Sequence, residues 1–221
     1  MFRRPITNKE SEFEYSPDYL TREKRMLFLR GVIAAYPGGY PGRNDQFSPT
    51  SIMDDIMAFN IEDPSKPITL FIDSIGGEFS TGMALYDIIK LSKAPIITVG
   101  INCASMGSII FMAGNKRLVF PSSRFMLHLP SAVIQSEVSL DVKELEIKSK
   151  ELNRVKEEVV DYYIDNGVTA GLGKSADKLK IRKQIFKDID RAFWLTAKEA
   201  INYGLADSII TKEELLGGAS V

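Results

Sequence analysis

Residues 95–108 read Pro-Ile-Ile-Thr-Val-Gly-Ile-Asn-Cys-Ala-Ser-Met-Gly-Ser. The first half of this stretch is almost entirely apolar, which is typical of a strand buried on both faces of a parallel sheet. Small residues then lead to Ser105, where a short helix is expected to begin and to continue to Ala113. This order predicts a strand, a tight turn and a helix, with a serine side chain at the turn.

The same alternation of strands and helices continues on both sides of this stretch. Strands are expected over residues 25–34, 67–73, 117–120 and 125–128, and helices from Ser48-Pro49 and over residues 79–92. Because continuously apolar strands alternate with helices, the sequence predicts an α/β fold built on a parallel sheet. Sites in such sheets form at the carboxyl ends of the strands, so Gly76, Gly77 and Ser105 are expected to face one crevice.

A long amphipathic helix is expected from about residue 139 to residue 165. Its apolar residues recur at helical spacing: Val142, Leu145, Leu152, Val155, Val159 and Tyr162. About 25 helical residues would span roughly 38 Å, and this length favours an oligomerisation arm over the alternative, a helix that covers the core. Beyond it the sequence predicts a helix over 175–189, a capping box at Thr196-Ala-Lys-Glu199 and a strand over 206–210.

Composition predicts one soluble globular domain. The 221 residues are 44% apolar and 26% charged, and the net charge of −1 gives no basic surface for nucleic acid or anionic lipid. No stretch approaches the ~20 apolar residues of a membrane span, and a single cysteine fits a reducing, cytoplasmic compartment. Residues 1–22 are expected to form a polar N-terminal arm, and residues 213–221 a frayed C-terminal tail.

His128 is the single histidine of the chain, within Arg124-Phe-Met-Leu-His-Leu-Pro130. Histidine is the side chain whose ordinary pKa lies near neutrality, so it is the natural general base for a serine nucleophile. His128 and Ser105 are therefore the candidate base and nucleophile. The alternatives are a histidine satisfied within the core and a serine that only caps a helix.

Backbone N–H groups near Ser105 are candidates for an oxyanion hole. The first N–H groups of a helix have no partner within it, which makes Met106 one possible donor. Gly76 and Gly77 follow a predicted strand, and glycines there let the backbone approach a ligand; the alternative is a simple tight turn. No metal site is expected, since Cys103 has no potential metal ligands nearby.

Five motifs occur in order along the chain: Phe71–Gly77, Thr81–Ile88, Ala104–Ser108, Arg124–Pro130 and Ala200–Ile209. Over roughly residues 18–212, the chain resembles the proteolytic subunit of the Clp protease, ClpP, a serine peptidase family. The resemblance implies a crotonase-like fold of repeated ββα units over residues 23–212, with the long helix projecting for contact between rings. It also implies that Ser105 is the nucleophile, His128 the base, and Gly76, Gly77 and Met106 the oxyanion region.

The acid of the family's catalytic triad has no counterpart here. Its motif aligns without a gap to Asp188-Ile-Asp-Arg-Ala-Phe-Trp-Leu-Thr196, which puts Ala192 at the acid's position. Either that acid is lost or a neighbouring acid such as Asp190 reaches His128, although Asp190 and Arg191 match a family pair that links ring contacts to the site. Losing the acid costs serine proteases about 10⁴-fold in kcat, so the chain is expected to be nearly inactive.

The resemblance also implies partners: two stacked heptameric rings, a Clp-type AAA+ unfoldase that uses the ATP, and unfolded polypeptide substrates. No cofactor is expected in this chain itself. One alternative is a non-catalytic structural or regulatory subunit that joins an active ClpP paralogue in mixed rings. Another is an acyl-CoA enzyme of the same broad fold. Extra length at 34–47 and 166–183, and an unusual N-terminal arm, depart from the family pattern.

Overall fold

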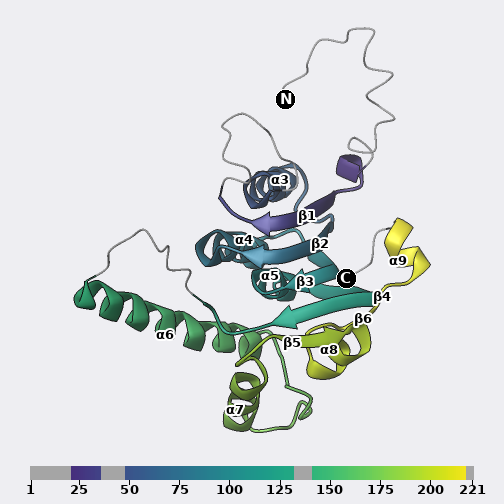
Figure 1. The fold of residues 1–221 in the computed structure, drawn as a ribbon. Coiled ribbons are helices and arrows are strands. Elements are labelled where there is room, and N and C mark those ends of the chain that lie inside the picture. The colour runs from purple at the N-terminus through teal and green to yellow at the C-terminus, as the bar shows by residue number, and fades with distance from the viewer. Residues whose placement is uncertain (1–20, 36–47, 132–140, 218–221) are drawn as a thin grey trace.

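A six-stranded sheet forms the centre of the molecule (Figure 1). The computed structural model describes residues 21–35, 48–131 and 141–217, and the statements below concern these residues. The strands are β1 Met26–Ile33, β2 Ile68–Gly77, β3 Ile96–Ala104, β4 Lys116–Leu127, β5 Phe193–Thr196 and β6 Ser208–Ile209. Strands β1 to β4 are parallel neighbours in chain order, β5 pairs antiparallel with β4, and β6 pairs parallel with β4. The parallel arrangement predicted from the sequence therefore holds for β1 to β4 and β6, and the strand β5, which was not predicted, makes the sheet mixed.

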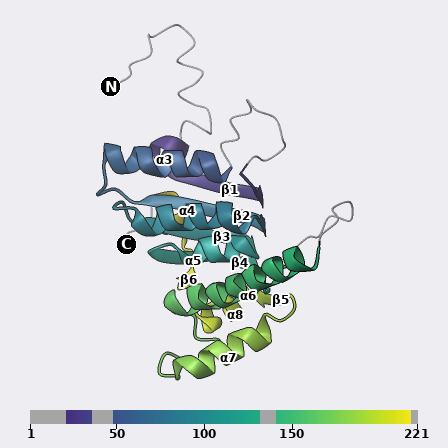
Figure 2. The ribbon, with the colours of Figure 1, turned by 90° about the vertical axis from the view of Figure 1, so that its left-hand side faces the viewer.

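Three helices cover one face of the parallel strands (Figure 2). They are α3 Pro49–Glu62, α4 Phe79–Leu91 and α5 Met106–Met112. Helix α3 begins as predicted, because the Ser48 hydroxyl accepts a hydrogen bond from the N–H of Ser51 and proline occupies the first helical position. The helices and the sheet enclose the main hydrophobic core, which includes Ile52, Leu85 and Ile110.

Two strands are longer than predicted. β2 continues through Gly76 and Gly77, which pair with Val32 and Ile33 of β1, so these glycines lie in a strand rather than in a turn after it. The two short strands expected at 117–120 and 125–128 form the single strand β4. Polar and small residues between its apolar segments hid that continuity in the sequence.

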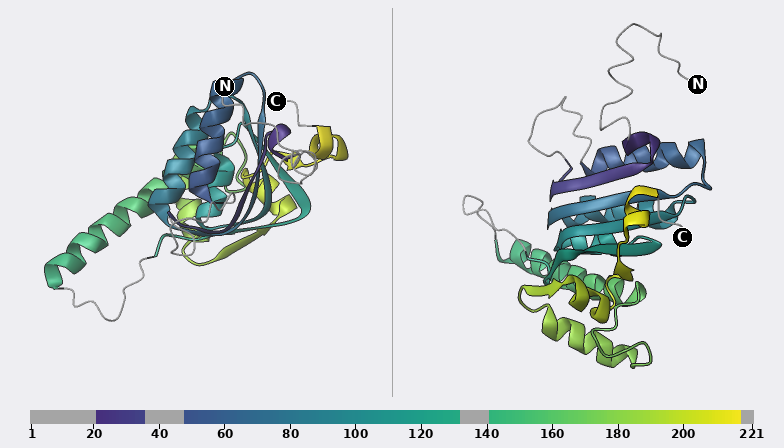
Figure 3. Two further views of the ribbon diagram at one scale, coloured as in Figure 1. Left: turned by 90° about the horizontal axis from the view of Figure 1, so that it is seen from above. Right: turned by 90° about the vertical axis from the view of Figure 1, so that its right-hand side faces the viewer.

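The opposite face of the sheet carries a smaller apolar cluster. Phe71, Ile97, Val99 and Leu118 form its buried centre, and Leu215 packs against it. Leu215 belongs to α9 Lys212–Gly217, which lies on this side of the sheet (Figure 3). Part of the expected frayed tail is therefore a helix, and an ion pair between Lys116 Nζ and Glu214 Oε1 at 3.1 Å attaches it to β4.

The long helix α6 Val142–Asp165 packs only through its C-terminal half. Val159, Val160 and Tyr163 are buried there, whereas the other end extends away from the sheet (Figures 1 and 3). Its N-cap is Asp141, which forms a capping box with Glu144. The expected start near residue 139 lies outside the described residues.

Two helices lie between α6 and β6 in the chain: α7 Lys178–Asp188 and α8 Ala197–Tyr203. Arg182 of α7 pairs with Glu157 and Asp161 of α6, which holds the two helices together. Helix α8 has the predicted capping box of Thr196 and Glu199 and ends at Gly204, whose φ of 89° is left-handed.

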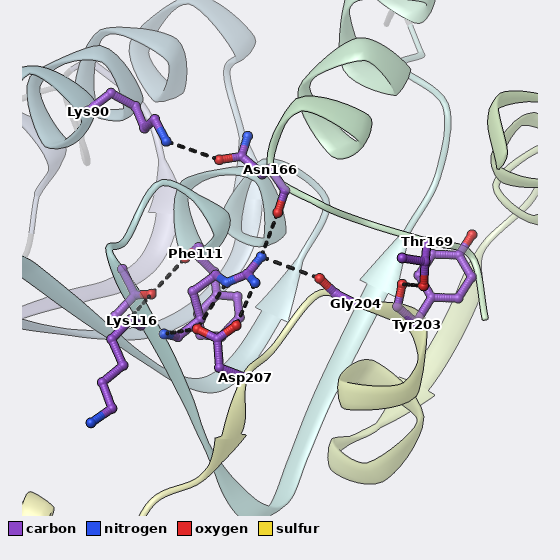
Figure 4. A network of polar contacts seen from close by, with 10 residues as sticks. Lys90, Phe111, Lys116, Asn166, Thr169, Tyr203, Gly204 and Asp207 are labelled. Atoms are coloured by element: carbon purple, nitrogen blue, oxygen red, sulfur yellow. Dashed lines mark hydrogen bonds and ion pairs between the residues drawn. The ribbon is translucent and has the colours of Figure 1, made fainter. Parts of the chain in front are cut away.

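Arg117 of β4 is the centre of a polar network that attaches the C-terminal third of the chain to the sheet. Its partners Asn166, Gly204 and Asp207 are labelled in Figure 4. The guanidinium of Arg117 donates to the carbonyl of Asn166 at 2.9 Å and to that of Gly204 at 3.3 Å. It also pairs with the Asp207 carboxylate at 2.5 Å. The Arg117 side chain thus contacts the C-terminal ends of α6 and α8 and the residue just before β6.

The described helices include none that is long and apolar enough to cross a membrane. Within the same residues there is no group of three or more His, Cys, Asp and Glu side chains placed to hold a metal ion. Most of the predicted N-terminal arm (1–20) and of the extra segment at 34–47 lies outside the described part of the chain.

Candidate active site

Ser105 occupies the turn between β3 and α5. Its φ of 53° and ψ of −122° lie in a region that residues with a side chain rarely adopt. The turn is held because the Ser105 N–H donates to the carbonyl of Met126 in β4 at 2.7 Å, and the Ser105 carbonyl accepts from the N–H of Ser108 at 3.0 Å. Such conformations persist only where the surrounding structure enforces them, and they gather at functional sites.

His128 follows the last residue of β4 and reaches Ser105. Parallel pairing sets Ala104 of β3 opposite Met126 of β4, so the residues just beyond the two strands are neighbours. The distance from His128 Nε2 to Ser105 Oγ is 2.8 Å. That is hydrogen-bonding distance for a base and its nucleophile.

Gly76 lies directly against the Ser105 turn. A Cβ added at Gly76 would come within 2.6 Å of Ser105 Cβ and 3.1 Å of the Met106 nitrogen, and its φ of 91° is also unfavourable for any other residue. Its own N–H is engaged, because it donates to Ser74 Oγ at 3.1 Å. A Cβ on Gly77 would instead collide with the Ile33 carbonyl of β1. Of the two glycines predicted for the oxyanion region, the structure thus brings Gly76 to Ser105 and sets Gly77 against β1.

Ala192 and His128 line one cleft of about 410 Å³. Among the described residues, the hydrogen bond to Ser105 is the one polar contact of His128, and no carboxylate bonds to its ring. Asp190 and Arg191 also line the cleft, but they form an ion pair with each other at 3.6 Å and are largely exposed. The structure therefore shows no bond between Asp190 and His128.

Two residues near Ser105 were not expected from the sequence. Ser108 Oγ donates to the Ser105 carbonyl at 2.6 Å and lies 3.0 Å from the hydroxyl of Tyr163. Since the single hydroxyl proton of Ser108 is already donated, Tyr163 must be the donor in the second bond. Burial raises the pKa of Tyr163 above its ordinary value, so the hydroxyl keeps this proton. The helical spacing of α6 marked Tyr162, not Tyr163, and no sequence signal connected Tyr163 with Ser105.

Comparison with known proteins assigns the family. A family model described as Clp protease matches residues 40–213. The chain belongs to the Clp protease family. "ATP-dependent Clp protease proteolytic subunit 2" of Prochlorococcus marinus (strain NATL2A) is 34% identical to it over 206 residues, which cover 91% of this chain and 90% of the relative.

A second relative bears a different subunit number. "ATP-dependent Clp protease proteolytic subunit 3" of Parasynechococcus marenigrum (strain WH8102) is 33% identical over 206 residues, which cover 91% of this chain and 90% of that protein. The mixed sheet with covering helices is consistent with this peptidase family, and the family motifs around Ser105 and His128 fall within the matched range.

Proposed function

We propose that this Clp protease family member is a serine endopeptidase subunit whose catalysis is impaired at the acid position. Ser105 is the nucleophile and His128 the base. The observation that supports the proposal best is the 2.8 Å contact between Ser105 Oγ and His128 Nε2. That contact, together with the methyl group of Ala192 in the cleft beside His128, argues for a serine–histidine pair without its orienting acid.

The chemistry follows from these atoms. His128 Nε2 takes the hydroxyl proton as Ser105 Oγ bonds to the peptide carbonyl carbon, and the carbonyl π electrons move onto its oxygen. When the C=O bond re-forms, the C–N bond breaks and His128 returns the proton to the leaving amine. Water then attacks the acyl-serine ester in the same way, with His128 taking the water proton and returning it to Ser105.

The developing oxyanion needs N–H donors beside Ser105. We assign this role to the N–H of Met106 first, because it opens α5 and has no partner within the helix. Gly76 is the second donor in this proposal, provided that its N–H exchanges Ser74 for the substrate oxygen. Gly77 is assigned to the wall of the region, where it abuts β1.

Impairment follows from how the histidine is used. For Nε2 to accept a proton, Nδ1 must carry one, and an acid on Nδ1 fixes that tautomer and stabilises the imidazolium that forms. Alanine can do neither. We therefore propose a deficit of about 10⁴-fold in kcat relative to a complete triad, with peptide binding retained.

The proposal extends to assembly. We propose that the chain forms stacked heptameric rings of the crotonase-like ClpP type, and that a Clp-type AAA+ unfoldase supplies unfolded polypeptides and uses the ATP. The projecting half of α6 supports a contact between rings, because Val142 and Ile147 are more than half exposed there. A cytoplasmic location, and no cofactor in this chain, complete the proposal.

A second candidate function is a structural or regulatory subunit in a ring shared with a complete paralogue. Ala192 and the differently numbered proteolytic subunits among the relatives favour it. Isolation of the chain from its source, followed by mass spectrometry, tests this candidate. A second ClpP homologue in stoichiometric amount would support it, and rings of this chain alone would exclude it.

Restoring the acid tests the main proposal. Ala192→Asp should raise kcat for a fluorogenic peptide by well over tenfold, because the new carboxylate orients His128. Ser105→Ala in that background should abolish the activity and serves as the control. A gain of less than about tenfold would show that loss of the acid is not what limits this chain.

A further inference from the structure

The cleft beside His128 holds an unusual set of groups. Its volume of about 410 Å³ far exceeds the space that one carboxyl group would need. Alanine and aspartate differ by that one group, so Ala192 leaves room for a carboxylate that is not part of the side chain at this position. The charged residues of the lining are Lys156, Asp190 and Arg191.

The histidine ring in this cleft has one nitrogen without a partner. Nε2 of His128 bonds to Ser105, and no described residue bonds to Nδ1. Nδ1 is not completely buried. Among the described residues, Arg25 Nε is the one completely buried side-chain nitrogen or oxygen that lacks a hydrogen-bond partner. Because His128 lines the cleft, the nitrogen that a triad acid would contact is left unoccupied by the described residues.

The same cleft offers an unpaired cation. Lys156 comes from α6 and is half-buried, and it makes no ion pair or hydrogen bond with any residue of the chain that the structure describes. Arg191 is 90% exposed and already paired with Asp190. Lys156 is thus the charge available to an incoming anion, while the charge of Asp190 is largely compensated by Arg191.

We propose that this cleft binds a carboxylate supplied from outside the chain, which accepts the Nδ1 proton of His128 and pairs with Lys156. This inference rests on the proposed serine–histidine chemistry. The bound carboxylate takes the place of the missing acid, and activity depends on its presence. Its source is either a small free carboxylate or an acidic side chain of the bound peptide.

Sodium formate tests whether a small free carboxylate is the source, because formate carries the carboxylate group that aspartate has and alanine lacks. Peptide cleavage by the full chain is measured in increasing sodium formate, with sodium chloride at matched ionic strength as the control. We expect a saturable increase of about tenfold or more, which is partial recovery of the ~10⁴-fold loss. Ala192→Asp should be active without formate and should not respond to it.

Peptides in matched pairs test the other source. Each pair carries Glu or Gln at one position near the scissile bond, and cleavage is followed without formate. If the peptide supplies the group, one Glu peptide is cleaved at least tenfold faster than its Gln partner, and only while residue 192 is alanine. If free carboxylate is the source, the Glu and Gln peptides behave alike and formate stimulates both.

Lysine variants test the cation. Lys156→Gln should need severalfold more formate for half-maximal stimulation, whereas Lys183→Gln, an exposed lysine of α7, should respond as the unaltered chain does. Asp190→Asn should keep the formate response. If Asp190→Asn instead abolishes the residual activity while sedimentation velocity shows an unchanged assembly, Asp190 is the acid and the proposal is overturned.

The single histidine gives a readout that is independent of turnover. With ¹⁵N-histidine labelling, every imidazole signal belongs to His128. A carboxylate hydrogen-bonded to the ring changes the surroundings of Nδ1, so increasing formate should shift the imidazole ¹⁵N signals of His128 saturably in the unaltered chain but not in Ala192→Asp.

Peptide cleavage and the His128 signals together distinguish a failure of the carboxylate site from a failure of the proposed function. Suppose that Ala192→Asp is active, while neither formate nor any Glu peptide changes the activity or the His128 ¹⁵N signals of the unaltered chain. The carboxylate site is then excluded and the proposed function survives. If Ala192→Asp is inactive, the proposed function fails. The ¹⁵N signals of His128 then decide on their own: a saturable shift with formate supports the site, and no shift excludes it.

Discussion

At the scale of single residues, Gly76 fixes the space around Ser105. Its positive φ would be unfavourable for alanine, and its missing Cβ would collide with Ser105 Cβ at 2.6 Å. Gly31 has a similar positive φ of 75°, yet nothing lies within 4 Å of its missing Cβ. A side chain at Gly31 would therefore cause backbone strain alone, whereas one at Gly76 would cause strain and also a collision with the nucleophile.

We predict that Gly76→Ala abolishes labelling of Ser105 by a fluorophosphonate in the Ala192→Asp background, because Ser105 must move away from His128. Gly31→Ala should keep the labelling rate within about threefold while it loses about 1–2 kcal/mol of stability from strain alone. Labelling is followed by intact mass, and stability by chemical denaturation. Equal labelling of the two variants would show that Gly76 does not control the position of Ser105.

Cys103 offers a second test at this scale. Its side chain is almost completely buried at the end of β3, and burial raises the pKa of its thiol well above the usual range. Because the thiolate is the reactive form, a raised pKa lowers its fraction at pH 8. We predict that Ellman's reagent detects almost no thiol in the native chain and one thiol per chain in guanidinium chloride. Rapid reaction of the native protein would contradict the packing of β3.

The predictability of the site differs from residue to residue. His128 could be identified because the chain has one histidine, and Ser105 because small residues follow an apolar strand. Two features of the glycines could not be predicted: the hydrogen bond from the Gly76 N–H to Ser74, and the position of Gly77 against β1. Both depend on a register shift in the pairing of β1 with β2. The contact of Tyr163 with Ser108 could not be predicted either, because the two residues are 55 positions apart in the sequence.

At the scale of elements, α6 is connected to the nucleophile through two hydroxyl groups. Tyr163 donates to Ser108, and Ser108 donates to the Ser105 carbonyl, so the buried end of α6 supports the strained turn at the start of α5. Tyr162, the preceding residue of the helix, makes no hydrogen bond through its hydroxyl with the described residues. Its ring packs against Tyr86 instead.

We predict that Tyr163→Phe lowers the free energy of unfolding by about 1 kcal/mol, because Ser108 loses a hydrogen-bond donor inside the core. Fluorophosphonate labelling of Ser105 in the Ala192→Asp background should slow severalfold as the turn loosens. Tyr162→Phe is the matched control and should change neither quantity. If stability falls but labelling is unchanged, the two hydroxyl groups stabilise the core without positioning Ser105.

The sequence placed the helices better than the strand ends. Helix starts carry local signals, such as the capping box at Thr196 and the proline after Ser48. The extension of β2 to Gly77 and the short strand β5 depend on partners elsewhere in the chain, Ile33 for Gly77 and Leu127 for Phe193. Pairing between distant segments leaves no local signal, which is why β5 was missed.

At the scale of the whole molecule, the projecting half of α6 exposes apolar side chains that no other described residue of the chain covers. Val142 is 75% exposed and Leu145 42% exposed, although both are apolar. Apolar side chains in a row on an extended helix indicate a surface that another chain covers. The proposed contact between rings would cover them.

We predict that Leu145→Glu splits the proposed double ring, because a charge at a contact that excludes water has no partner. Sedimentation velocity should show smaller particles, while circular dichroism and the melting temperature of the separated chains change little, since Leu145 is not part of the core. Asn153→Glu adds the same charge at an exposed polar position of the same helix and should leave the double ring intact. An unchanged sedimentation coefficient for Leu145→Glu would exclude this end of α6 from the ring contact, and the exposed apolar residues would then need another partner.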